Sequence, residues 1–190
     1  YIEAIRATLP ELPDKRGARF VSEYGLSDYD AGVLVATREM ADYFETTAKL
    51  SGDAKHAANW VSQDLQALLN KHGWELDESP IQAERLAMLI QRIKDNTISG
   101  KIAKTVFDAM LDDSSDVDAI IEAKGLKQVT DSGALETLVD KVIAENPDQA
   151  QQYRDGRVQV IGFLVGQCMQ LSKGKANPAQ VNEILRGKLS

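Results

Sequence analysis

Hydrophobic residues recur along this chain at the period of an α-helix. The clearest stripe covers 135–143, where leucine, valine and isoleucine fall at i, i+3, i+4, i+7 and i+8. Related stripes occur at 61–69, 86–93 and 181–185. This spacing places apolar side chains on one helix face, whereas a half-buried strand would alternate apolar and polar residues, and no segment does so convincingly. The sequence therefore predicts an all-α fold.

Three segments carry the residues that begin helices: Ser79-Pro-Ile-Gln82, Asn146-Pro-Asp-Gln149 and Asn177-Pro-Ala-Gln180. In each, the first side chain can accept a hydrogen bond from a free N–H of the first turn, and proline stands where a missing N–H costs nothing. Glutamine three residues later can reach back to the cap. Left-handed glycines are expected to end helices at Gly25, Gly73 and Gly125.

An acidic run at residues 111–118, Leu-Asp-Asp-Ser-Ser-Asp-Val-Asp, interrupts the helical periodicity. We place a domain boundary there, which gives a helical domain at 1–113 and a smaller all-α tail domain at 114–190. A solvated loop inside one continuous bundle, with Asp116 beginning the next helix, explains the run equally well.

Charge is distributed unevenly along the 190 residues, whose formal net charge is −7. Residues 1–153 carry 16 Lys and Arg against 27 Asp and Glu, whereas residues 154–190 carry six against two. Nucleic-acid-binding domains usually have a basic balance, so the acidic balance of residues 1–153 argues against an RNA role for most of that part. The basic charge is gathered at the C-terminal end.

The sequence offers no catalytic constellation and no metal site. It contains neither a P-loop motif nor a Gly-x-Gly-x-x-Gly motif after a strand, and neither His56 nor His72 has a further ligand at a recognisable spacing. Cys168, the single cysteine, lies in an apolar segment, which favours a buried inert thiol. We assign no catalytic residue, no metal and no cofactor to this chain.

The sequence also bears on where the protein is located in the cell and on whether the chain is part of a longer protein. No apolar run is long enough to cross a membrane, no secretory signal is visible, and one cysteine cannot form an internal disulfide. We expect a cytoplasmic protein. The chain starts at Tyr1, followed by Ile2, Ile5 and Leu9 at helical spacing, so we expect it to be part of a longer protein.

Gly162 and Gly166 lie four residues apart in an apolar segment that includes 158–165. Glycine costs roughly 1 kcal/mol relative to alanine inside a helix, so two of them on one face require a reason. Close approach of a second helix is the packing explanation. We therefore expect this segment to be a central helix, buried around its whole circumference.

The turn Lys173-Gly174-Lys175 separates that segment from the helix start at Asn177. In one interpretation, Gly174 ends the first helix and the lysines stabilise its negative end. In the other, the two ammonium groups and the free N–H groups of the next helix converge on a phosphate.

Four segments carry a resemblance to a known family: LPELPDKRGARFVSEYGLSDYDAGVL (9–34), ANWVSQDLQALLN (58–70), ISGKIAKTVFDAM (98–110) and GFLVGQCMQLSKGKANPAQVNEIL (162–185). The chain resembles the C-terminal region of the B subunit of aspartyl/glutamyl-tRNA amidotransferase, a helical domain followed by a YqeY-like tail.

That resemblance implies a role with tRNA(Gln), tRNA(Asn) or both. In the family, the complete B subunit uses ATP and magnesium to activate a misattached glutamate or aspartate, and the A subunit supplies ammonia from glutamine. The A and C subunits are the implied protein partners. The catalytic part precedes the region present here, so this chain is expected to bind and position tRNA without catalysis. Recognition would rest on RNA shape, because an A-form duplex hides its base edges.

The resemblance also indicates residues for tRNA contact. The first choices are Lys173, Lys175 and Asn177, at the family's Lys-Gly-Lys-Ala-Asn-Pro turn. Further candidates flank the apolar segment or lie in Ile-Ser-Gly-Lys-Ile-Ala-Lys: Arg154, Arg157, Lys101 and Lys104. A second function stays open, in which the chain is a protein-docking module and the Lys173 turn binds an acidic surface of another protein in the complex.

Overall fold

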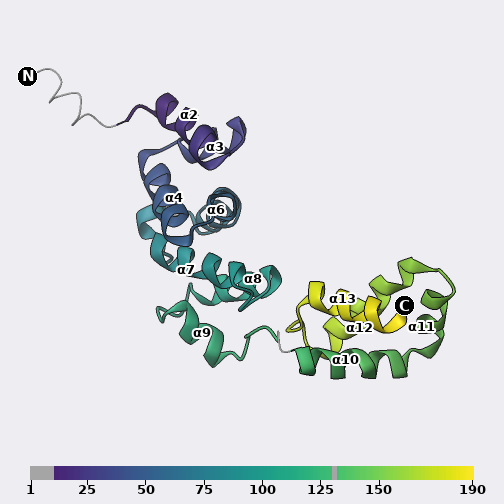
Figure 1. Ribbon diagram of the computed structural model, residues 1–190. Coiled ribbons are helices and arrows are strands. Elements are labelled where there is room, and N and C mark those ends of the chain that lie inside the picture. The colour runs from purple at the N-terminus through teal and green to yellow at the C-terminus, as the bar shows by residue number, and fades with distance from the viewer. Residues whose placement is uncertain (1–10, 130–131) are drawn as a thin grey trace, which may run out of the picture. The chain divides into compact units, whose positions relative to one another are not determined.

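The structure, a computed structural model, describes residues 11–129 and 132–190, and within these ranges it is all-α (Figure 1). Helices joined by short loops account for nearly all regular structure, which confirms the predicted fold class. No described helix has the length and apolar character needed to cross a membrane. The helical spacing expected at Ile2, Ile5 and Leu9 lies outside the described residues.

The chain divides into two compact units between Gln91 and Arg92. In the N-terminal unit, aromatic side chains form part of the core, with Phe20 and Phe44 fully buried and their ring centroids 4.8 Å apart. Its elements are α2 (Pro13–Tyr24), α3 (Asp28–Leu34), α4 (Arg38–Ser51), α5 (Ala54–Asn59), the π-helical η1 (Trp60–Leu65), α6 (Gln66–His72), the 3₁₀ turn η2 (Leu76–Glu78) and most of α7 (Ala83–Lys94).

The C-terminal unit contains the end of α7 and all following helices. These are α8 (Gly100–Ala109), α9 (Val117–Ala123), α10 (Ser132–Glu145), α11 (Pro147–Arg154), the 3₁₀ turn η3 (Val158–Val160), α12 (Ile161–Leu171) and α13 (Pro178–Leu189). The last four α-helices enclose one apolar cluster, formed by Leu135, Val139, Val142, Ala150, Leu164, Cys168, Ala176, Val181, Leu185 and Leu189. Because α10, α12 and α13 each contribute a stripe, none of them is stable alone.

The predicted helix starts have three different outcomes. Helix α13 begins at Pro178, and Asn177 caps it with its side chain, as expected. Helix α11 begins at Pro147, but the Asn146 side chain donates to the Val142 carbonyl behind it and makes no cap bond.

The third predicted start, at Ser79, is wrong, because α7 begins only at Ala83. The side-chain bonds expected there do form, because the Ser79 hydroxyl accepts from the Ile81 N–H at 3.2 Å and the Gln82 amide donates to the Ser79 carbonyl at 3.1 Å. Ile81 is fully buried, and its carbonyl accepts a hydrogen bond of 2.8 Å from the Tyr43 hydroxyl, so tertiary contacts keep this stretch out of the helix.

Left-handed glycines end helices where the sequence predicts them. Gly25 and Gly73 have φ values of 65° and 68° and follow α2 and α6. Gly125, at φ 59°, follows the last turn of α9, and Leu126 closes the turn by donating to the Ile121 carbonyl. Since only glycine adopts this conformation without cost, these stops are local properties of the sequence.

The acidic run separates α8 from α9, and Asp116 precedes α9 without making a side-chain cap bond. The domain limits placed at 113 and 114 stay a prediction.

The expectation for α12 is wrong in two respects. Only Leu164 and Cys168 are buried within this helix, while Phe163 is 47% exposed and Val158, just before it, is 60% exposed. Nothing lies within 4 Å of a Cβ built on Gly162 or Gly166, so no neighbouring helix packs against these glycines. The helix therefore covers the core with one face and leaves the other open.

Candidate nucleic-acid interface

The turn after α12 is built around a lysine in a conformation that favours glycine. Lys173 has φ 54°, and its N–H donates to the Gln170 carbonyl while that of Gly174 donates to the Met169 carbonyl at 2.8 Å. This pair of bonds is a Schellman motif, in which the first left-handed position is usually glycine. The helix is thus ended by Lys173, with Gly174 continuing the turn at φ 78°. The side chain of Lys173 is exposed.

Lys175 has a different environment from Lys173. Its ammonium nitrogen lies 3.9 Å from the position of a Cβ on Gly125, next to the end of α9. Carbonyl groups at a helix C-terminus lack partners and attract cations. The structure therefore places the half-buried Lys175 at the C-terminal end of α9, whereas the sequence suggested the end of α12.

The side-chain oxygen of Asn177 accepts hydrogen bonds from the backbone of this same chain. This oxygen accepts from the backbone N–H groups of Ala179, at 3.0 Å, and Gln180, at 3.3 Å. Pro178 has no N–H to offer. The N–H groups of Ala179 and Gln180 are therefore already hydrogen-bonded to Asn177. The phosphate interpretation needed these groups free at the start of α13, and they are not.

A short extended segment joins the Lys173 turn to the loop before α8. Val129 donates to the Lys175 carbonyl at 2.6 Å and forms an isolated parallel bridge with Ala176. The backbone of Gln128 donates to the Thr97 carbonyl at 2.6 Å, and the same residue is buried. This segment therefore connects the start of α8 with the end of α12.

A groove lined by two predicted lysines lies between α8 and the end of α12. Lys101, from the first turn of α8, and Lys173 both line a cavity of about 520 Å³. Gly166 and Gln170, from the open side of α12, line it as well. Two predicted residues that are far apart in the sequence thus share one site, and both side chains are exposed.

The remaining predicted residues do not line this groove. Arg154 ends α11 and Arg157 precedes η3, and both are exposed beside the N-terminal end of α12. Lys104 is exposed on α8, one turn after Lys101. Cations therefore occur at both ends of α12, with the groove at its C-terminal end.

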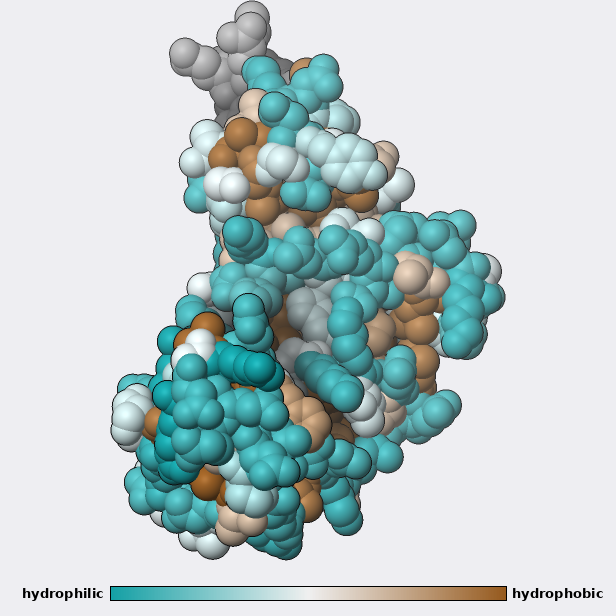
Figure 2. All heavy atoms as spheres, turned by 90° about the vertical axis from the view of Figure 1, so that its right-hand side faces the viewer, coloured by the Kyte–Doolittle hydropathy of each residue, from teal (hydrophilic) through white to brown (hydrophobic). Residues whose placement is uncertain are grey.

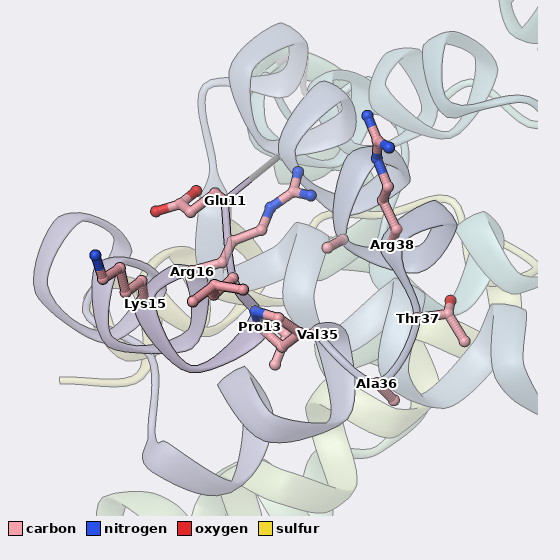
Figure 3. Close-up of a pocket in the computed structure, with 10 residues that line it drawn as sticks. Glu11, Pro13, Lys15, Arg16, Val35, Ala36, Thr37 and Arg38 are labelled. Atoms are coloured by element: carbon pink, nitrogen blue, oxygen red, sulfur yellow. The ribbon is translucent and has the colours of Figure 1, made fainter. Parts of the chain in front are cut away.

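A larger cavity, of about 870 Å³, lies in the N-terminal unit among α2, α3 and α4 (Figure 3). It is lined by Pro13, Val35 and several charged side chains, including Arg16. Arg16 is engaged by acids, because its guanidinium pairs with Glu45 and, at 2.6 Å, with Asp42. None of the predicted tRNA-contacting residues lies here.

Other candidate chemistry receives little support within the described ranges. No group of three or more His, Cys, Asp or Glu side chains there could hold a metal ion. His56 pairs with Asp53 at 2.8 Å, and His72 stacks on Trp74 with ring centroids 4.3 Å apart. Cys168 is buried, as predicted, and burial raises its pKa to about 11. Such a thiol is a poor nucleophile at neutral pH.

The sequence did not predict the exposed apolar side chains around α12: Val158, Phe163 and Leu171. An apolar run all round a helix normally indicates burial. The one available signal was the cost in helix stability of Gly162 and Gly166, which indicated that this face of the helix has a role other than packing in the core.

These features define a class: an all-α protein whose C-terminal unit presents basic and apolar side chains together at its surface. Figure 2 shows a face of the molecule on which separate hydrophobic patches lie among hydrophilic side chains. Comparison with known proteins identifies the family within this class. The chain belongs to the GatB domain family, which matches residues 42–189.

Its relatives include the B subunits of several aspartyl/glutamyl-tRNA(Asn/Gln) amidotransferases. That of Ectopseudomonas mendocina is 58% identical, that of Alkalilimnicola ehrlichii 57% and that of Thioalkalivibrio sulfidiphilus 56%. Each comparison covers the whole of this chain and 40% of the relative. The family resemblance inferred from the sequence is thereby confirmed.

Proposed function

We propose that this chain is the tRNA-binding C-terminal region of the B subunit of a glutamine-dependent amidotransferase. The complete enzyme would convert Glu-tRNA(Gln) to Gln-tRNA(Gln), Asp-tRNA(Asn) to Asn-tRNA(Asn), or both. The role of this region is to bind and position the tRNA. The names of the relatives support the reaction, and the chain spans only 40% of their length.

One observation carries the binding role: Lys101 and Lys173 line the same groove and both are exposed. Two cations that line one groove can contact successive phosphates of an RNA backbone. Lys173 also adopts a left-handed backbone conformation that glycine would adopt at lower cost, and its charged side chain is exposed at the groove. Lys175 and Asn177 support this site by fixing the turn.

Catalysis belongs to the part of the protein outside this chain. ATP and magnesium would act there, and the A and C subunits would assemble with the whole protein, in the cytoplasm. The acidic balance of residues 1–153 repels phosphate, so either RNA touches only a basic strip of the helical scaffold, or the tail makes most of the contact and the helical part mainly docks and spaces.

The test is the affinity of the chain for a tRNA(Gln) transcript at several salt concentrations. The double variant Lys101→Glu/Lys173→Glu should bind more weakly, and the slope of log K against log salt should fall by about one for each lost phosphate contact. Lys141→Glu/Lys188→Glu is the matched control, since both lysines are in the same unit, pair with acids and do not line the groove.

Equal binding by wild type and the groove variant would remove the proposal. A protein-docking module is the second candidate, and the exposed Phe163 favours it to the extent that apolar patches mark protein interfaces. In that case the groove variant would lose its affinity for the A or C subunit and keep its affinity for tRNA.

A further inference from the structure

The open face of α12, defined as Gly162, Phe163, Gly166 and Gln170, is unexplained by the packing of this chain. These residues follow one another at intervals that bring them to one side of the helix, and all four are exposed. The opposite side carries Leu164 and Cys168 into the core. The open face therefore contributes little to folding, although it contains one large aromatic ring and two costly glycines.

The surroundings of this face are cationic. Arg157 is exposed just before η3, and Lys173 is exposed just after the helix. Residues 154–190 contain six Lys and Arg against two Asp and Glu. One acid, Asp155, accepts from the Gln151 side chain at 2.9 Å. A ligand that suits this surface has flat apolar groups and several negative charges.

We propose that the open face of α12 receives an unpaired nucleobase of the bound tRNA, which stacks on Phe163, while the adjoining backbone passes over Gly162 and Gly166. The proposal rests on the proposed function and assigns a contact that the lysine groove cannot make. An RNA strand combines flat apolar bases with one charge per nucleotide, which matches an exposed aromatic ring on a helix that has exposed cations just before and just after it in the chain.

Glycine at these positions has a specific use in this arrangement. Without a Cβ, the helix surface is recessed beside the Phe163 ring, so a ribose or phosphate can approach the helix backbone closely. Gly166 also lines the groove that holds Lys101 and Lys173. A strand with its phosphates in the groove is therefore already adjacent to the open face.

The experiment compares two RNA probes, a tRNA(Gln) transcript and a fully paired RNA duplex of equal length, at one salt concentration. Phe163→Ala should weaken tRNA binding roughly fivefold to a hundredfold, the range for loss of one base–aromatic stack, and should leave duplex binding unchanged. Phe163→Tyr should keep wild-type affinity, and Phe163→Leu should behave like alanine, because only an aromatic ring stacks.

The glycines provide a second arm that does not depend on Phe163. Gly166→Ala should raise the melting temperature, since alanine is the better helix former, and yet weaken tRNA binding. Gly187→Ala is the matched control, because Gly187 is an exposed helical glycine of α13 with nothing within 4 Å of a Cβ. That control should leave tRNA affinity unchanged.

The outcomes separate this inference from the proposed function. If Phe163→Ala binds tRNA as wild type does while Lys101→Glu/Lys173→Glu is weakened, the open face has no base contact and the proposed function stands. Equal weakening of tRNA and duplex binding by Phe163→Ala also overturns the inference. If the wild-type chain binds neither RNA, both proposals fall. If Phe163→Ala instead changes only self-association or assembly with the A or C subunit, the open face is a protein-binding surface.

Discussion

The ammonium nitrogen of Lys175 lies 3.9 Å from the place that a Cβ on Gly125 would occupy, so a lysine after α12 stands at the end of α9. The last carbonyls of α9 carry partial negative charge, and a cation there stabilises the helix. The two lysines of the Lys-Gly-Lys turn therefore have different surroundings: Lys175 is half-buried beside the end of α9, and Lys173 is exposed.

Replacing Lys175 should affect stability more than RNA binding. We expect Lys175→Met to lower the free energy of unfolding by about 0.5–1 kcal/mol, the usual value of a cation at a helix end. Its affinity for tRNA should fall less than that of Lys173→Met. Urea denaturation and filter binding on the two variants measure both quantities, and a larger affinity loss for Lys175→Met would contradict the assignment.

Replacing Lys173 by glycine should have the opposite pattern. Lys173→Gly removes the cost of a left-handed non-glycine residue, so the unfolding free energy should rise by roughly 0.5–1 kcal/mol. Affinity for tRNA should fall, because the charge is lost. Lys173→Ala is the control: it loses the charge but keeps the strained Cβ, so it should show no gain in stability. A destabilised Lys173→Gly would mean that the lysine side chain itself holds the turn.

The cap of α13 should be worth about 1 kcal/mol. Asn177→Ala removes the acceptor for the Ala179 and Gln180 N–H groups and should lower the unfolding free energy by that amount. Asn146→Ala should cost less, because Asn146 makes no cap bond at α11. Asn177→Asp keeps an acceptor and should retain the stability. Similar losses for both alanine variants, in thermal or urea unfolding, would show that the cap is not the relevant interaction.

The N-terminal unit should lose stability in acid through Glu45. Burial alone would raise the pKa of this carboxyl, but hydrogen bonds from Arg19 and Arg16 outweigh burial and lower the pKa to about 2. A lowered folded-state pKa adds stability above the unfolded value near 4.5, and this contribution is lost as pH falls from about 5 to about 2.

Wild type should thus exceed Glu45→Gln by about 3 kcal/mol at neutral pH, and most of the difference should be lost by about pH 2. The control is Glu136→Gln, at an exposed position of α10, which should change little at any pH. Unfolding by urea across this pH range checks the prediction, and a pH-independent difference would assign the loss to packing.

Helix ends show how far local reasoning reaches in this chain. Gly73 and Asn177 behave as predicted because their effects involve only neighbouring backbone groups. Ser79 makes its local bond to the Ile81 N–H, but the helix does not start there, because the Tyr43 hydroxyl donates to the Ile81 carbonyl and Ile81 is buried outside the helix. A contact between residues so distant in the sequence has no local signature.

The sequence predicted some residues of the candidate site but not how they are arranged in space. Lys101 and Lys173 were both selected from the sequence, through the family resemblance, but nothing in their spacing placed them in one groove. Between the two, Gln128 and Val129 hydrogen-bond to Thr97 and Lys175 and so link the loop before α8 to the turn after α12. Phe163 was assigned to the core because its neighbours are apolar, and hydropathy cannot reveal which side of a helix lacks a partner.

By itself, the sequence determined the all-α class, the family, most helix ends and the concentration of basic charge near the C-terminus. These follow from side-chain periodicity, capping and the left-handed preference of glycine, which act within a few residues. The tertiary structure alone decided that α12 has an open face, that Lys175 lies beside the end of α9, and that Lys101 lines the same groove as Lys173. Each of these depends on which distant surfaces exclude water from one another, and that is settled only when the whole chain packs.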